Sequence, residues 1–126
     1  MNTIKNKSIL IAEDEYLNYF FLEAVIKKMD LGLDIAHVDC GEKAIENAKM
    51  NHDMALILMD LKMPGIDGFN ATEEIRKFNK TIPIVAQTAY TSEEDKKKAM
   101  SSGCNAIITK PIDINLLEEI VRKYCS

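Results

Sequence analysis

The sequence predicts an α/β fold in which five parallel strands form one sheet with helices on both of its faces. Three observations support this prediction. Short apolar runs alternate with segments of helical periodicity, the central run is apolar at every position, and most runs end in a polar residue. Five strands and five helices in strict alternation indicate right-handed βαβ units. We therefore expect a doubly wound, three-layer sandwich.

Composition is that of an ordinary globular protein. The chain has 126 residues, 47% of them hydrophobic and 29% charged, with a net charge of −4. These values favour a core of ordinary size and exclude disorder. No apolar run approaches the about 20 residues of a membrane span, the first residues lack the apolar core of a signal peptide, and no basic stripe indicates nucleic-acid binding. We expect a single domain over residues 1–126, with a core of about residues 7–124.

Cysteine usage favours a reducing compartment. Three cysteines are scattered along the chain, and none belongs to a CxxC pair. A disulfide scaffold or a zinc site is therefore not expected, and the cytoplasm is the expected location.

The first half of the chain is predicted to contain three strands and two helices. Ile9–Ala12 is the first strand. A helix follows from Leu17 to a stop at Gly32, then a strand over residues 33–38 and a helix over residues 41–50. Met54–Met59 is apolar throughout and too short for a typical helix, which is typical of a strand covered on both faces. The apolar residues at helical spacing, which are predicted to share one face of the first helix, are Leu17, Phe20, Phe21, Ala24 and Val25.

The second half is predicted to contain two strands and three helices. A loop over residues 62–68 leads into a helix that ends near Phe78, and residues 82–86 form the fourth strand. Thr91 and Glu94 form a predicted capping box for a helix that ends at Gly103. Residues 106–108 form the last strand, and Asp113 is expected to cap the last helix. The inner stripe of that helix is predicted to be Leu117, Ile120, Val121 and Tyr124.

Polar residues with useful chemistry lie at four of the five predicted strand ends. Glu13 and Asp14 follow the first strand, Asp60 the third, Thr88 ends the fourth, and Lys110 follows the fifth. Alone, each is more commonly a cap, a turn residue or a solvated side chain. Parallel strands bring their carboxyl ends to one edge, where the sites of open α/β sheets form. Their joint placement therefore predicts a functional site.

The charges of this cluster indicate its chemistry. Two unit charges about 4 Å apart at an effective dielectric near 20 repel by about 4 kcal/mol, and Lys110 alone cannot balance three acids. The cluster therefore needs a cation or protons. Mg²⁺ suits such oxygen ligands, which leaves Lys110 to hold an anion. With the Thr88 hydroxyl, these are the groups needed for phosphoryl transfer to a carboxylate, and Asp60 is the best nucleophile.

Four stretches of the chain resemble the response-regulator receiver domains of two-component signalling systems. They are ILIAEDE (residues 9–15), LMDLKMPGIDG (58–68), PIVAQTA (83–89) and ITKP (108–111). The resemblance covers nearly the whole chain. It implies a flavodoxin-like fold with five helices and sheet order 2-1-3-4-5. It also implies a cytoplasmic signalling module that catalyses only its own aspartyl phosphorylation and dephosphorylation.

The resemblance implies a phosphoacceptor and a metal site. Asp60 would accept a phosphoryl group from a histidine kinase or a histidine phosphotransfer protein, and phosphorylation would switch partner binding. Mg²⁺ would be bound directly by Asp14 and Asp60, through water by Glu13, and by the backbone carbonyl of Lys62. No binding of nucleic acid or membrane by this domain alone is implied.

The remaining roles concern the phosphoryl oxygens. Thr88, the backbone amide of Ala89 and the Lys110 ammonium would hold these oxygens. The bond between Lys110 and Pro111 would be cis, a form that costs only about 0.5–1 kcal/mol before proline.

Some positions depart from the commonest family pattern. Glu13 stands where Asp is most frequent, and its longer side chain suits a water-mediated metal contact. Ile107 stands where many members carry an aromatic switch residue, so switching works differently or weakly here. Lys62 and Tyr90 flank the site. Asn18 and residues 86–90 resemble receivers of hybrid sensor kinases, and a free-standing regulator remains an alternative.

Two other interpretations compete with a signalling module. A phosphatase or phosphotransferase that works through an aspartyl phosphate would need a second acid beside the nucleophile and a cap over the substrate. Leu61 and Lys62 follow Asp60 instead, and no insertion could form a cap. A receiver-like domain without phosphorylation is the third alternative, and the intact Asp60, Thr88 and Lys110 argue against it. Tyr16, Leu17 and Tyr19 beside the site either pack or form a docking surface.

Overall fold

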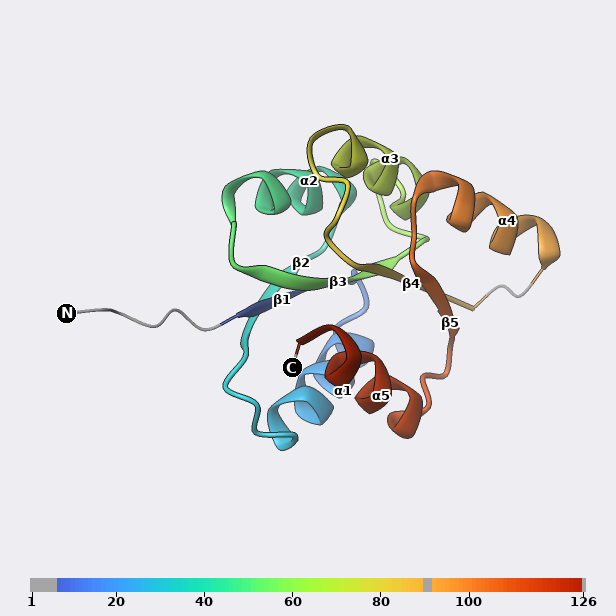
Figure 1. The fold of residues 1–126 in the computed structure, drawn as a ribbon. Helices are drawn as coiled ribbons and strands as arrows, with labels where there is room; N and C mark the ends of the chain where they lie inside the picture. The colour runs from blue at the N-terminus through green and yellow to red at the C-terminus, as the bar shows by residue number, and fades with distance from the viewer. Residues whose placement is uncertain (1–6, 90–91, 126) are drawn as a thin grey trace.

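The computed structural model describes residues 7–89 and 92–125 and contains the predicted alternation of strands and helices (Figure 1). The strands are β1 (Ser8–Ala12), β2 (Asp34–Val38), β3 (Met54–Asp60), β4 (Ile84–Thr88) and β5 (Ala106–Thr109). The helices are α1 (Tyr16–Lys28), α2 (Gly41–Met50), α3 (Gly68–Phe78), α4 (Glu93–Ser102) and α5 (Ile114–Cys125). Each predicted element is present, with ends that differ by a few residues.

The five strands form one parallel sheet in the order β2-β1-β3-β4-β5. Helices α2, α3 and α4 cover one face, and α1 and α5 cover the other (Figure 1). The central strand β3 is buried on both faces, as its unbroken apolar run predicts. The predicted doubly wound sandwich with order 2-1-3-4-5 is confirmed.

Two apolar cores lie on the two faces of the sheet because successive strand residues point to opposite faces. On β1, Leu10 packs into the core under α2, α3 and α4, whereas Ile9 and Ile11 pack into the core under α1 and α5. The first core is rich in small helix residues, which let these helices approach the sheet closely. They are Ala44, Ala48, Ala71 and Ala99.

Gly68 brings the start of α3 against the end of β3. A Cβ atom at this position would lie 2.3 Å from the carbonyl oxygen of Asp60 and 2.7 Å from Cα of Leu61. The backbone amide of Gly68 donates a hydrogen bond to the Leu61 carbonyl at 3.1 Å. This close approach fixes the loop after Asp60.

The predicted face of α1 is only partly correct, because Phe21 and Val25 do pack against the core under α1 and α5. Leu17 is 86% exposed and Phe20 is 54% exposed, whereas Leu22 and Ile26 are buried against the sheet. Helix α1 is apolar on more than one side, so several series of residues show helical spacing, and packing against the sheet and α5 selects among them. Tyr19 packs both on this core and on the edge strand β2, where its ring stacks on that of His37 with the ring centroids 3.8 Å apart.

Helix ends also differ from the predictions. Helix α1 ends at Lys28 rather than at Gly32, and Asp30 adopts the left-handed conformation with φ of 53°. The N-cap of α4 is Ser92, whose hydroxyl accepts a hydrogen bond from the Asp95 amide at 3.1 Å. The predicted cap Thr91 and the flanking Tyr90 lie outside the described residues.

Two other helix ends were predicted correctly. Gly103 ends α4 with φ of 114°. Asp113 accepts hydrogen bonds from the amides of Asn115 and Leu116 at the start of α5. Among the described residues, no helix is long and apolar enough to cross a membrane.

Candidate functional site

The carboxyl ends of β1, β3, β4 and β5 surround one cavity of about 320 Å³. Its walls contain residues from all four predicted strand ends. They are Asp14, Glu15, Asp60, Lys62, Thr88, Ala89 and Lys110. Glu13 is buried beside this cavity and contacts the Lys110 ammonium. The structure therefore brings together all the residues that are predicted to hold the metal ion and the phosphoryl group.

Strand register places these residues side by side. Asp60 pairs with Gln87 across β3 and β4, and Thr88 pairs with Thr109 across β4 and β5. The backbone amide of Lys110 donates a hydrogen bond to the Thr88 carbonyl at 2.8 Å. The sheet thus holds the strand ends rigidly, which suits a site that must keep a fixed geometry. The peptide bond that follows Lys110 is cis, as predicted.

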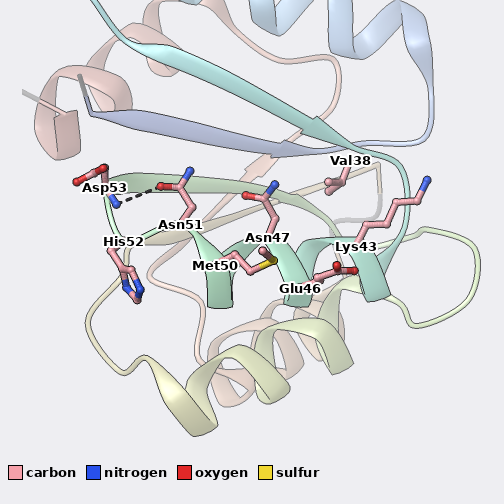
Figure 2. Close-up of a pocket in the computed structure, with 8 residues that line it drawn as sticks. All are labelled: Val38, Lys43, Glu46, Asn47, Met50, Asn51, His52 and Asp53. Atoms are coloured by element: carbon pink, nitrogen blue, oxygen red, sulfur yellow. Dashed lines mark hydrogen bonds between the residues drawn. The ribbon is translucent and has the colours of Figure 1, made fainter. Parts of the chain in front are cut away.

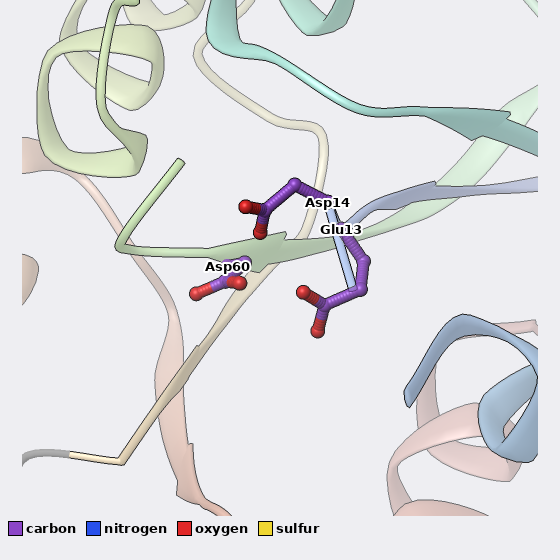
Figure 3. A group of neighbouring side chains, drawn as sticks. All are labelled: Glu13, Asp14 and Asp60. Carbon is purple, nitrogen blue, oxygen red and sulfur yellow. The ribbon is translucent and has the colours of Figure 1, made fainter. Parts of the chain in front are cut away.

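Three carboxylates of the site lie within reach of one ion. Figure 3 shows Glu13 and Asp14 at the end of β1 and Asp60 at the end of β3. One oxygen from each lies within 4.8 Å of the others. Glu13 and Asp60 are buried, and Asp14 is exposed, so an ion would enter past Asp14. A set of oxygen donors fits a hard divalent cation.

Lys110 bridges the two buried carboxylates. Its Nζ atom lies 3.0 Å from Oε1 of Glu13 and 3.1 Å from Oδ2 of Asp60. The other Asp60 oxygen, Oδ1, accepts a hydrogen bond from the Lys62 amide at 3.0 Å. The Asp60 carboxylate is therefore held in one orientation from both sides.

Crowding of these charges shifts their pKa values. Burial and the neighbouring Glu13 carboxylate raise the pKa of Asp60 to about 7. Burial also opposes ionisation of Glu13, but its hydrogen bonds with Asp60, Lys110 and Asn18 outweigh this effect and lower its pKa. Burial disfavours the charged form of Lys110, yet its hydrogen bond to Glu13 and the charge of Asp60 raise its pKa. The carboxylate pair therefore favours a bound proton near neutral pH, and a cation could replace that proton.

Two polar residues of the site environment were not assigned a role from the sequence. Asn18 on α1 donates a hydrogen bond to Glu13 Oε1 and another, at 3.1 Å, to Oε1 of Gln87. Gln87 is fully buried. The sequence signal was a polar residue inside the buried strand β4, one position before Thr88. Ile107, which stands where many family members carry an aromatic residue, is partly buried against the core under α2, α3 and α4.

Comparison with curated proteins finds sensor kinases. Sensor protein GacS of Pseudomonas syringae pv. syringae is 33% identical over 121 residues, which cover 92% of this chain and 13% of GacS. The chain thus spans only a small part of the length of this relative.

Comparison with solved structures finds receiver domains. The receiver domain of sensor histidine kinase PA1611 from Pseudomonas aeruginosa, with a magnesium ion coordinated in its active-site cleft, superimposes with a TM-score of 0.84. It is 30% identical, and the match covers 96% of this chain and 98% of that one. A co-crystal structure of Saccharomyces cerevisiae Ypd1, a histidine phosphotransfer protein, with the receiver domain of Ssk1 gives a TM-score of 0.83 at 30% identity, with 98% of this chain and 92% of that one covered.

The family model of the response regulator receiver domain matches residues 9–122. This range begins in β1, ends in α5 and contains every residue of the cavity described above. With the strand order and the acidic cluster at the strand ends, the match leaves one assignment: the chain belongs to the response regulator receiver domain family, the signalling modules of two-component phosphorelays.

Proposed function

We propose that Asp60 is the phosphoacceptor of this receiver domain and that the acidic cluster binds Mg²⁺. One observation supports this above all. The buried Asp60 carboxylate faces a cavity that it shares with Lys110, Thr88 and the Ala89 backbone, beside two further carboxylates. In this assignment Asp14 and Asp60 are direct metal ligands, Glu13 acts through water, and the carbonyl of Lys62 completes the set.

In this proposal each residue of the cavity has a separate role in phosphoryl transfer. An Asp60 oxygen attacks phosphorus of a phosphohistidine, the new O–P bond forms as the P–N bond breaks, and the imidazole leaves. Lys110, Thr88 and the Ala89 amide hold the phosphoryl oxygens, as hydrogen-bond donors and a fixed positive charge stabilise the charge that develops there. Bound Mg²⁺ would neutralise the carboxylates and a phosphoryl oxygen together.

The donor in this proposal is a histidine kinase or a histidine phosphotransfer protein, and phosphorylation switches binding of a partner. The match to the complex of Ypd1 with the Ssk1 receiver supports such a partner. We place the domain in the cytoplasm, the reducing compartment that its scattered cysteines favour. Residues 1–126 form one domain in this proposal, with a core of about residues 7–124.

Acetyl phosphate tests the proposal, because it supplies a phosphoryl group without a kinase. With Mg²⁺, intact-mass analysis is expected to show one added phosphoryl group. The group is expected to be absent from Asp60→Asn and after chelation of the metal. Asp34→Asn is the matched control, because Asp34 is an exposed carboxylate at the amino end of β2, whereas the site lies at the carboxyl ends of the strands. This variant is expected to be labelled like the wild type.

Other outcomes would favour the alternatives. Label that remains in Asp60→Asn would move the nucleophile elsewhere. Repeated turnover of phosphoesters would favour an enzyme. A wild-type protein that takes up no label would favour a receiver-like domain without phosphorylation.

A further inference from the structure

Gln87 is a buried polar residue in an apolar environment. It is fully buried in β4, and the nearby strand residues Val85 and Ile108 belong to the apolar core under α1 and α5. Its Nε2 group has no hydrogen-bond partner among the described residues. A buried unpaired donor costs about 1–3 kcal/mol. A leucine would avoid this cost, so stability does not explain the glutamine.

The other end of the Gln87 amide makes a specific contact. Its Oε1 atom accepts a hydrogen bond from Nδ2 of Asn18 at 3.1 Å, and the same Nδ2 group donates to Oε1 of Glu13. An asparagine Nδ2 group has two hydrogens, and these two acceptors use both. The Asn18 amide is therefore held in one orientation between β4 and the end of β1.

This contact matters for the metal site because it acts on Glu13. Besides Asn18, the Glu13 carboxylate accepts hydrogen bonds from Lys110 at 3.0 Å and from the Glu15 amide at 3.2 Å. Lys110 is shared with Asp60 and, in the proposed function, turns to a phosphoryl oxygen. Asp60, the other side-chain hydrogen-bond partner of Glu13, is a metal ligand in the proposed function. Asn18 is then the remaining side-chain donor to Glu13 among the described residues.

We propose that Gln87 is a positioning residue, which acts through Asn18 to hold the Glu13 carboxylate in the orientation that the metal site requires. The proposal rests on the Mg²⁺ site of the proposed function but not on phosphoryl transfer. Partners that orient metal ligands typically contribute about 10-fold to 100-fold to metal affinity. Because Glu13 contacts the ion through water in the proposed function, we expect the lower end of this range.

The test compares Mg²⁺ affinity with thermal stability in Gln87→Leu. Mg²⁺ binding is measured by titration calorimetry without a phosphodonor, and the melting temperature is measured without metal. We expect Mg²⁺ binding to weaken by about 10-fold, while the melting temperature stays the same or rises because the unpaired amide is gone. A purely structural role of Gln87 would lower both quantities together.

A double-mutant cycle tests the route through Asn18. Asn18→Ala is expected to weaken Mg²⁺ binding by a similar factor, and Gln87→Leu is expected to have no further effect in the Asn18→Ala background. Asn47→Leu is the matched control. Asn47 on α2 also has a buried amide atom without a partner among the described residues, but it lies outside the site. This control is expected to bind Mg²⁺ like the wild type.

Each contrary result has a distinct meaning. Unchanged Mg²⁺ affinity in Gln87→Leu, or a loss of affinity that accompanies a lower melting temperature, overturns the positioning role. Additive effects of the two substitutions overturn the route through Asn18. A wild-type protein that binds Mg²⁺ but takes no phosphoryl group would contradict the proposed function and leave the positioning role supported if the cycle behaves as expected.

Discussion

Two hollows of this molecule differ in volume and in the residues that line them. The larger one lacks the converging buried charges of the smaller one. The hollow beside α2 has a volume of about 640 Å³, and the cavity at the strand ends has about 320 Å³. Figure 2 shows that the larger hollow is lined by Val38 and by residues of α2 and the turn after it. The smaller cavity is lined by residues from four segments far apart in the chain.

Two ion pairs of equal length make the comparison quantitative. Nζ of Lys43, in the larger hollow, lies 3.1 Å from Asp39, and these side chains are 60% and 50% exposed. Lys110 also lies 3.1 Å from Asp60, but these side chains are 18% and 4% exposed. Exposed pairs typically contribute only about 0–1 kcal/mol, whereas burial strengthens each electrostatic interaction. The two hollows thus differ in the burial of their charges as well as in volume, and the proposed phosphoryl transfer relies on the buried, converging charges.

Removal of the two lysines is expected to give the largest difference. Lys110→Ala should slow phosphorylation by acetyl phosphate by about 100-fold, because it removes the positive charge that would stabilise the transferred group. Lys43→Ala should leave the rate unchanged. The initial rate of mass increase with Mg²⁺ measures both. Equal rates for the two variants would show that the buried Lys110 pair contributes no more to phosphorylation than the exposed Lys43 pair.

Stability without metal is expected to depend on pH through Asp60. Its pKa is about 7 in the folded protein, whereas an unperturbed aspartate has 3.8. Between these pH values the folded state therefore holds a proton that the unfolded state has lost. Stability therefore falls as pH rises through this window. With a chelator present, the free energy of unfolding in urea should fall by about 2 kcal/mol from about pH 5 to about pH 8.

Two aspartate variants identify the origin of this slope. Asp60→Asn should lose most of the pH dependence, since the crowded carboxylate is gone. Asp39→Asn should retain it, because the hydrogen bond from Lys43 lowers the pKa of Asp39 and moves its titration below this range. A slope that persists in Asp60→Asn would assign the titration to another group.

The smallest expected effect is in the larger hollow. Asn47→Leu should raise the free energy of unfolding by about 1 kcal/mol, because it removes a buried carbonyl oxygen without a partner among the described residues and places a better helix former in α2. The phosphorylation rate should not change. Urea denaturation measures the first quantity and intact-mass kinetics the second. A slower rate in this variant would connect the two hollows.

Local sequence patterns predicted much of the fold and of the site. Apolar runs that give way to polar residues at Asp60, Thr88 and Lys110 mark the ends of the strands, because the apolar core ends there and the polar cavity begins. Gly103 marked the end of α4 correctly because a left-handed residue favours glycine. The cap of α4 was misplaced by one residue because Thr91 and Ser92 are both good N-caps.

What the sequence by itself determined is the order of elements and the polar groups at the strand ends, since both depend on residues close together in the chain. Only the tertiary structure decided which face of α1 is buried, that Gln87 contacts Asn18 across 69 positions, and that the pKa of Asp60 rises to about 7. These features depend on contacts between side chains and on burial. Such contacts act over only a few ångströms in space, and the residues that make them have no fixed spacing along the chain.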